Sequence, residues 1–304
     1  MDSDSSTRIW FTLDFELGWG VAESGLWKTR QNMGVYRDLH ERIDELIDLF
    51  SRHEISVTWA TVGAMITDPG KWQFEHLPLA AKEYLSTFTD YAAKESVDGR
   101  SLIEKVEKAS NNHTIACHSY SHVRFNYPEY TEAAVKNDLE LACAALGNYG
   151  RYSNSLVLPQ NIEANMGALK RSGISLCRTS PLDRKKNRYL RKFANTVGRF
   201  PGSDNWDQDG VLYNSGTLFF NTPAGRWRDD YLLWLLKRAT RDAISQSHDL
   251  HFWAHPFNFT LNPSLFEVAE RYFRWLETLR AQGTITSTCW SDTALNPVVR
   301  SDNH

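Results

Sequence analysis

Short apolar runs alternate along this chain with segments in which apolar residues recur every three to four positions. The first run, residues 9–13, is nearly continuous, as is typical of a strand covered on both faces. The segment after it places Leu39, Ile43, Leu46 and Phe50 on one face of a helix. The same criteria predict further strands at 56–62, 113–117, 156–158, 174–177, 211–213, 218–220, 250–255 and 285–288, and helices at 135–146, 163–171, 232–243 and 262–282.

Strands that alternate with helices predict a parallel sheet with crossover helices. No repeat, linker or low-complexity segment divides the chain, so we expect one α/β domain over residues 8–295, folded as a distorted (β/α) barrel. Residues 1–7 are expected to be disordered and residues 296–304 flexible. Residues 181–209 are expected to form a loop, and they are candidates for a lid. In such folds the site lies at the C-terminal ends of the strands.

Composition narrows the class of protein. The net charge of −3 over 304 residues gives no electrostatic footprint for nucleic acid. The acidic, polar N-terminus has no signal-peptide pattern, and no apolar run approaches the roughly 20 residues of a membrane span, so a cytoplasmic protein is expected. The four cysteines are too widely spaced for a disulfide framework or a cysteine zinc site.

Two acids, Asp14 and Glu16, end the first predicted strand. Residues at i and i+2 of a strand point to the same side, and two adjacent negative charges are costly unless a cation compensates them. A bound metal ion would do so. The alternative is a solvated turn that carries two exposed acids.

Two histidine pairs also follow or end predicted strands. His118 and His122 come directly after residues 113–117, and at i and i+4 of a helical turn they can share one metal ion. Ser119 stands where a zinc protease of the H-E-x-x-H type has its glutamate, which excludes that reading. In 250–255 the strand period places His255 at the rim and His251 lower in the sheet, where a structural role is expected.

Four motifs, in order, resemble those of the polysaccharide deacetylase family of carbohydrate esterases. They are Thr12-Leu13-Asp14-Phe15-Glu16, the second-strand pattern at residues 58–63, the histidine motif at residues 115–122, and His255-Pro256. The resemblance spans residues 8–290, and the histidine motif is its most specific part. It implies a distorted (β/α) barrel with one divalent metal, usually zinc.

The resemblance also implies roles for individual residues. Glu16, His118 and His122 would be metal ligands, Asp14 the general base and His255 the general acid. Trp19, Trp253 and the Pro159-Gln160-Asn161 segment are hypothetical sugar contacts. Two features depart from the family. Phe15 separates the two acids, and Val157 occupies a position where the family often has an arginine. Whatever steadies Asp14 must then differ, and Gln160 or Asn161 could supply hydrogen bonds instead. Asp204, Asp207 and Asp292 are the candidates for an acid that orients His255.

The function expected from these motifs is removal of an acetyl or formyl group from the nitrogen of an amino sugar. An acylated amino sugar, a nucleotide sugar or a glycan precursor of surface polysaccharide would be the substrate. Two alternatives stay open. The chain could hydrolyse a non-sugar amide or a cyclic imide, or it could be an inactive homologue that binds metal and carbohydrate.

Overall fold

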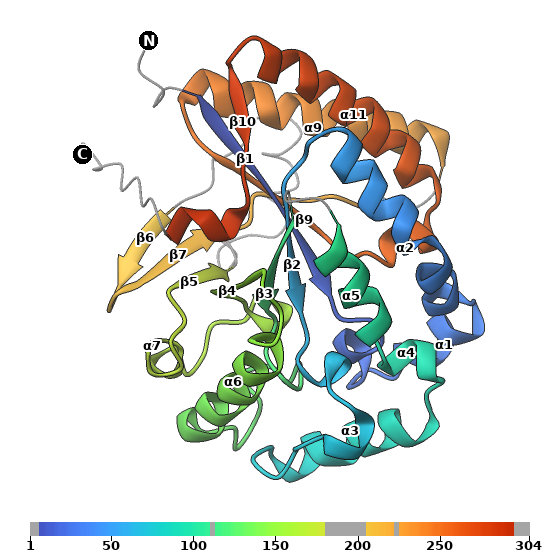
Figure 1. The fold of residues 1–304 in the computed structure, drawn as a ribbon, viewed down its shortest axis with the longest axis vertical. Helices are drawn as coiled ribbons and strands as arrows, with labels where there is room; N and C mark the ends of the chain where they lie inside the picture. The colour runs from blue at the N-terminus through green and yellow to red at the C-terminus, as the bar shows by residue number, and fades with distance from the viewer. Residues whose placement is uncertain (1–5, 110–112, 180–204, 222–224, 295–304) are drawn as a thin grey trace.

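A parallel β-sheet curls through the centre of the protein, and helices cover its outside in this computed structural model (Figure 1). The structure describes residues 6–109, 113–179, 205–221 and 225–294. The strands in this part are β1 Thr7–Phe15, β2 Val57–Thr61, β3 His113–Cys117, β4 Tyr152–Val157, β5 Leu176–Thr179, β6 Asn205–Gln208, β7 Val211–Ser215, β8 Leu218–Phe219, β9 Leu250–Ala254 and β10 Ile285–Ser287.

Helices connect successive strands and pack against the outer face of the sheet. They are α1 Leu26–Asn32, α2 Val35–Arg52, α3 Leu79–Tyr91, α4 Lys94–Val97, α5 Arg100–Lys108, α6 Glu132–Leu146, α7 Gly167–Arg171, α9 Arg226–Gln246, α10 Asn258–Leu261 and α11 Ser264–Ala281. Figure 1 shows α9 and α11 together along one side of the sheet, and these two helices contact each other. None of the described helices is long and apolar enough to cross a membrane.

The strand order is β6-β7-β5-β4-β3-β2-β1-β9-β8, with β10 paired to the start of β1. Every pair is parallel except β6 with β7. The expected parallel α/β sheet is therefore confirmed. Residues 205–208 form a strand, so the part of the expected loop that is described is not irregular, and residues 180–204 lie outside the described residues.

One continuous stretch, residues 211–219, contributes two strands that lie near opposite ends of the strand order. Its first half, β7, pairs with β5, and its second half, β8, pairs with β9. Between them the Gly216 N–H donates to Thr179 O at 3.3 Å, and the Thr217 N–H donates to His251 O at 2.8 Å. A Cβ on Gly216 would lie 3.2 Å from Cδ1 of Trp253, so the close approach of this segment to β9 favours glycine.

The alternation of side chains along β1 separates the core from the site. Odd-numbered residues from Ile9 to Phe15 belong to the main core under the helices, where Phe11 packs on Phe50, Phe252 and Phe273. Even-numbered residues face the other side of the sheet. Trp10 forms a small inner cluster with Ala60, Ala116, Val157, Leu176, Leu212 and Trp290. Thr12, Asp14 and Glu16 continue this inner column toward the C-terminal end of the strand.

The boundaries expected for the domain differ slightly from the observed elements. Thr7 already belongs to β1, whereas residues 1–5 and the whole of 296–304 lie outside the described residues. The four cysteines are free, in agreement with their wide spacing.

Candidate metal centre and catalytic site

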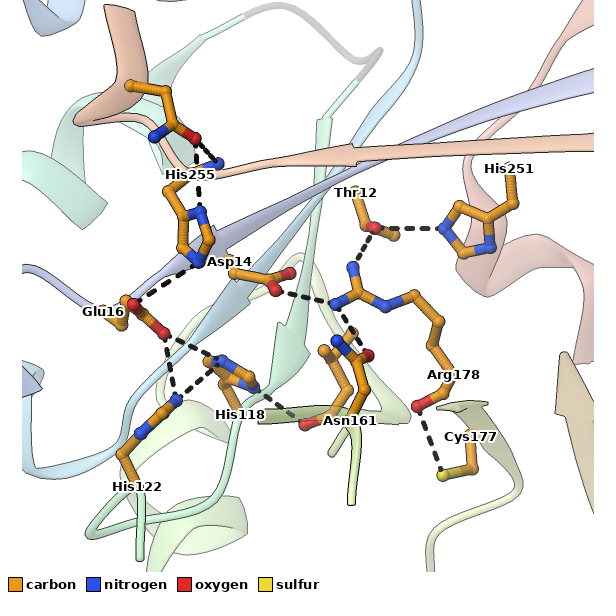
Figure 2. Close-up of polar contacts among 12 residues, drawn as sticks. Thr12, Asp14, Glu16, His118, His122, Asn161, Cys177, Arg178, His251 and His255 are labelled. Atoms are coloured by element: carbon orange, nitrogen blue, oxygen red, sulfur yellow. Dashed lines mark hydrogen bonds and ion pairs between the residues drawn. The ribbon is translucent and has the colours of Figure 1, made fainter. Parts of the chain in front are cut away.

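Glu16, His118 and His122 converge at the C-terminal ends of β1 and β3 (Figure 2). Glu16 Oε2 lies 3.3 Å from His118 Nε2 and 2.9 Å from His122 Nε2, and the two Nε2 atoms are 3.1 Å apart. All three side chains are buried. Ligand atoms bound tetrahedrally at about 2.05 Å from zinc lie about 3.3 Å from one another, so the donor atoms already stand near the required spacing.

The tautomer of His118 also suits a metal ligand. Its Nδ1 lies 2.8 Å from the carbonyl oxygen of Val157, which can only accept a hydrogen bond. Nδ1 therefore carries a proton, so Nε2, which faces Glu16 and His122, is the nitrogen available to a metal. A backbone carbonyl that fixes the far nitrogen is a common second partner of metal-binding histidines.

Glu16 is ionised in this environment. Burial opposes ionisation of the carboxyl group, but the neighbouring His255, His122 and His118 together lower its pKa well below the usual value. A buried carboxylate and two imidazoles with converging nitrogen atoms form a donor set that zinc accepts, so the residues present fit a divalent metal.

His118 and His122 do not lie on the helical turn that their spacing predicted. Residues 118–122 form an irregular loop, in which Ser119 and His122 have positive φ angles of 61° and 59°. The buried carboxylate of Asp138 holds this loop, because it accepts the N–H groups of Tyr120 at 2.9 Å and Ser121 at 3.1 Å. Asp138 comes from the buried face of α6, and sequence analysis did not identify it.

We expect Asp138→Ala to lower zinc affinity by about 10- to 100-fold, because the backbone that aims both imidazoles loses its anchor. Asp138→Asn keeps one acceptor oxygen, so its zinc affinity should lie between that of Asp138→Ala and that of the wild type. Competition with a chromogenic chelator measures the affinity. Glu140→Ala, which removes a half-exposed acid of the same helix, is the matched control. Unchanged zinc affinity in Asp138→Ala would show that residues 118–122 keep their conformation without Asp138.

Asp14 lies beside the three candidate ligands and points toward Arg178 of β5 (Figure 2). Arg178 is fully buried and donates from Nη2 to Asp14 Oδ2 at 2.7 Å and to Asn161 Oδ1 at 3.2 Å. Asp14 Oδ1 is buried and has no hydrogen-bond partner in the described structure. One oxygen of Asp14 is thus held by a cation, while the other is left to accept a proton.

Gln160 and Asn161 were the residues expected to steady Asp14 in place of the family's arginine, but a different residue does so in the structure. Gln160 is exposed, and the described contact of Asn161 toward Asp14 runs through the guanidinium of Arg178, which donates to both side chains. Position 157 lacks the arginine, and the neighbouring strand provides one instead. The signal in the sequence was a single charged residue inside the short apolar strand Leu176–Thr179.

Behind Asp14, a buried hydrogen-bond chain fixes Arg178. Arg178 Nη1 donates to Thr12 Oγ1, which lies 3.0 Å from His251 Nε2. His251 Nδ1 in turn contacts Asn214 Oδ1. Burial and the charge of Arg178 hold the pKa of His251 well below its usual value, so this imidazole stays neutral. His251 therefore lies within a buried hydrogen-bond chain, lower in the sheet than His255, as a structural role would require.

His255 follows the end of β9, and its Nε2 lies 3.5 Å from Glu16 Oε1. Its Nδ1 is 3.2 Å from Asn258 Oδ1, which also accepts the backbone N–H of His255 at 2.9 Å. The described partner of His255 Nδ1 is therefore the amide of Asn258, not one of the expected acids. Asp292 lies in the 3-10 helix after β10, which contacts β1, β2, β4 and β5, and no described contact joins it or Asp207 to His255. Asp204 lies outside the described residues.

The aromatic candidates for sugar contact differ in position. Trp253 is half-buried beside the site, stacks on Phe219 at 4.3 Å, and has the Arg178 guanidinium 5.1 Å from its ring. Trp19 is buried, donates to Val97 O and packs against Phe88, so it is a core residue in this structure. Pro159 is also buried.

Comparison with solved structures identifies the class of fold. A protein of Mycobacterium smegmatis assigned as a polysaccharide deacetylase superposes with a TM-score of 0.65 at 11% identity, over 97% of this chain and 91% of that one. A protein of Pseudomonas aeruginosa PAO1 with the same assignment gives 0.57 at 14% identity, over 97% and 92%. A 4-alpha-glucanotransferase of Thermococcus litoralis gives 0.52 at 11% identity, but only 41% of that chain is covered.

The chain therefore has the distorted (β/α) barrel of the polysaccharide deacetylases, and the expected fold is confirmed. No protein-family model matches the sequence, and no curated protein matches it.

Proposed function

We propose that this protein is a metal-dependent hydrolase that removes an acetyl or formyl group from the nitrogen of an amino sugar. The observation that carries the proposal is the convergence of Glu16, His118 and His122 next to an aspartate with one free, buried oxygen. We propose zinc as the metal and biosynthesis of surface polysaccharide as the setting.

A divalent ion bound by these three residues would polarise the acyl carbonyl group and make water more acidic. Asp14 Oδ1 takes the proton from the attacking water, while Arg178 keeps the carboxylate in place through Oδ2. His255 then gives a proton to the departing amine. Both nitrogens of His255 face oxygen acceptors, Asn258 Oδ1 and Glu16 Oε1, so the ring is placed to hold the two protons that a general acid needs.

Glycoside chemistry, which a glucanotransferase of similar fold carries out, suits this site less well. A glycosidase needs one of its two carboxyl groups to be protonated. Here Glu16 is held ionised by three imidazoles, and Asp14 is paired with a buried guanidinium. Neither group is placed to act as the acid, whereas both fit the roles proposed above.

Chelation tests this proposal. Release of amine and acetate from N-acetylglucosamine, or of formate from an N-formyl amino sugar, should stop when the metal is removed and return when zinc is added. Full turnover after complete removal of the metal would overturn the proposal. Faster turnover of ureides or cyclic imides would favour the non-sugar amidohydrolase, and tight sugar binding without turnover in the metal-loaded protein would favour an inactive homologue.

A further inference from the structure

Two buried polar atoms near His255 have no hydrogen-bond partner in the described structure. They are Nη1 of Arg30, in α1, and the hydroxyl oxygen of Tyr36, in α2. Tyr36 is fully buried, and Arg30 is half-buried, so part of its guanidinium can be reached from solvent. No ion pair of Arg30 is found among the described residues.

Phe257 links these two residues to the proposed general acid. Its ring stacks on His255 at 4.8 Å, and the guanidinium carbon of Arg30 lies 4.3 Å from the centre of the same ring. Tyr36 packs edge-on against Phe257 at 6.4 Å. Burial raises the pKa of Tyr36 to about 12, whereas the charge of Arg30 and donation from its guanidinium toward the phenol oxygen oppose this rise, and the charge of Glu16 adds to it. The phenol is therefore a proton donor at neutral pH, within the electrostatic reach of the site.

A partly buried guanidinium without a counter-charge is costly, and so is a buried hydroxyl whose proton has no acceptor. An anionic oxygen would satisfy both atoms, since guanidinium and phenol are both hydrogen-bond donors. We propose that Arg30 and Tyr36 form a subsite for an anionic group of the substrate, a phosphate or a carboxylate. The inference rests on the proposed function for its location, but the subsite is defined by its own residues.

This subsite gives the substrate a chemical class, an N-acyl amino sugar that carries a negative charge near the amide. A 2-acylamino sugar 1-phosphate has this form, because its two groups stand on neighbouring carbons, and nucleotide-linked sugars share it. A hexosaminuronate would present a carboxylate instead. A neutral N-acyl sugar would leave Arg30 and Tyr36 without an anionic acceptor.

The test combines turnover with binding. Metal-loaded wild type, Arg30→Gln, Arg30→Lys and Tyr36→Phe are compared on N-acetylglucosamine, its 1-phosphate and N-acetylglucosaminuronate. Calorimetry with inorganic phosphate measures the subsite without any reaction. Arg37→Gln is the matched control, because Arg37 follows Tyr36 in α2 but is exposed and paired with Asp38.

We expect Arg30→Gln to reduce kcat/KM for the preferred anionic sugar by about 10- to 100-fold, the effect of losing a charge-assisted hydrogen bond, mainly through KM. Turnover of the neutral sugar by Arg30→Gln should hardly change. The Arg37→Gln control should turn over both kinds of sugar like the wild type. Phosphate affinity should fall with the same variant, and Arg30→Lys should restore part of it. Preference for the 1-phosphate or for the uronate identifies the anion.

Two outcomes separate this inference from the proposed function. If phosphate binds and Arg30→Gln weakens it, but no sugar is deacylated, the subsite stands and the proposed function fails. If neutral and anionic sugars are deacylated equally and Arg30→Gln changes neither turnover nor phosphate binding, the subsite is overturned and the function stands. Thermal unfolding of each variant shows whether it is folded, and Arg30→Lys replaces Arg30→Gln if the latter is not.

Discussion

Replacement of Asp14 by asparagine is expected to lower kcat for acyl release by a factor of about 10² to 10⁴, the usual contribution of a positioned general base. The amide has the shape of the carboxylate and leaves an oxygen for Arg178, but it cannot take up a proton at neutral pH. Because Asp14 is not among the three converging ligands, the variant should keep its metal. Steady-state release of acetate and elemental analysis of the purified protein measure the two effects.

The companion variant Glu16→Gln should lose its metal, whereas Asp14→Asn should keep the metal and lose turnover. Removing a direct ligand should lower zinc affinity by more than the roughly 10- to 100-fold that loss of an outer partner costs. The pair of variants therefore assigns the two acids of β1. A metal-free Asp14→Asn protein together with a metal-loaded Glu16→Gln protein would show that the two roles are exchanged.

Replacement of Arg178 by methionine is expected to lower the free energy of unfolding by about 3–5 kcal/mol. Removing one member of a buried ion pair leaves the other charge uncompensated in the protein interior. Here the carboxylate of Asp14 would remain, with Oδ1 already unpaired and Oδ2 newly so. Activity should also fall, since the guanidinium no longer holds the carboxylate. Urea unfolding of the metal-free protein measures the stability.

A double-mutant cycle separates this pair from general disruption of the core. Asp14→Asn in the Arg178→Met background removes the stranded charge, so the double variant should regain part of the stability lost in Arg178→Met alone. Arg171→Met is the control, because Arg171 is about half-exposed and should contribute within about 1 kcal/mol. Additive effects of the Asp14 and Arg178 changes would show that the two side chains are not coupled in stability.

The sequence predicted most of the sheet because its strands are short apolar runs closed by polar residues. The boundaries of β3 were predicted residue for residue, and the period of two along β1 correctly placed Asp14 and Glu16 on one side. His118 and His122, placed by the sequence directly after a strand, converge with Glu16 in the structure. These features depend on local sequence, which is what periodicity reports.

The residues that sequence analysis missed act across the barrel. Arg178 reaches Asp14 from a strand 164 positions later in the chain, and Asp138 reaches the histidine loop from a helix 17 residues downstream. No spacing rule connects such pairs. Arg178 directly follows the strand predicted over 174–177, and Asp138 lies three positions after Val135 in the predicted helix, so each adjoins a segment predicted to be buried, where a charge needs a partner. The helical turn expected for residues 118–122 was wrong because Asp138 satisfies two backbone N–H groups of that loop from outside it.

The strand order determines when this site can form during synthesis. β1 precedes every other described strand, yet one of its two long edges pairs with β9, whose residues come about 240 positions later. At roughly 5–20 residues per second, the nascent chain carries that edge unpaired for roughly 12–50 s. Exposed edges invite pairing with other chains, so this interval is when we expect the growing chain to be most prone to aggregation. The three proposed metal ligands leave the ribosome well before His255, so the side chains proposed to hold an ion are made before the one proposed to protonate an amine.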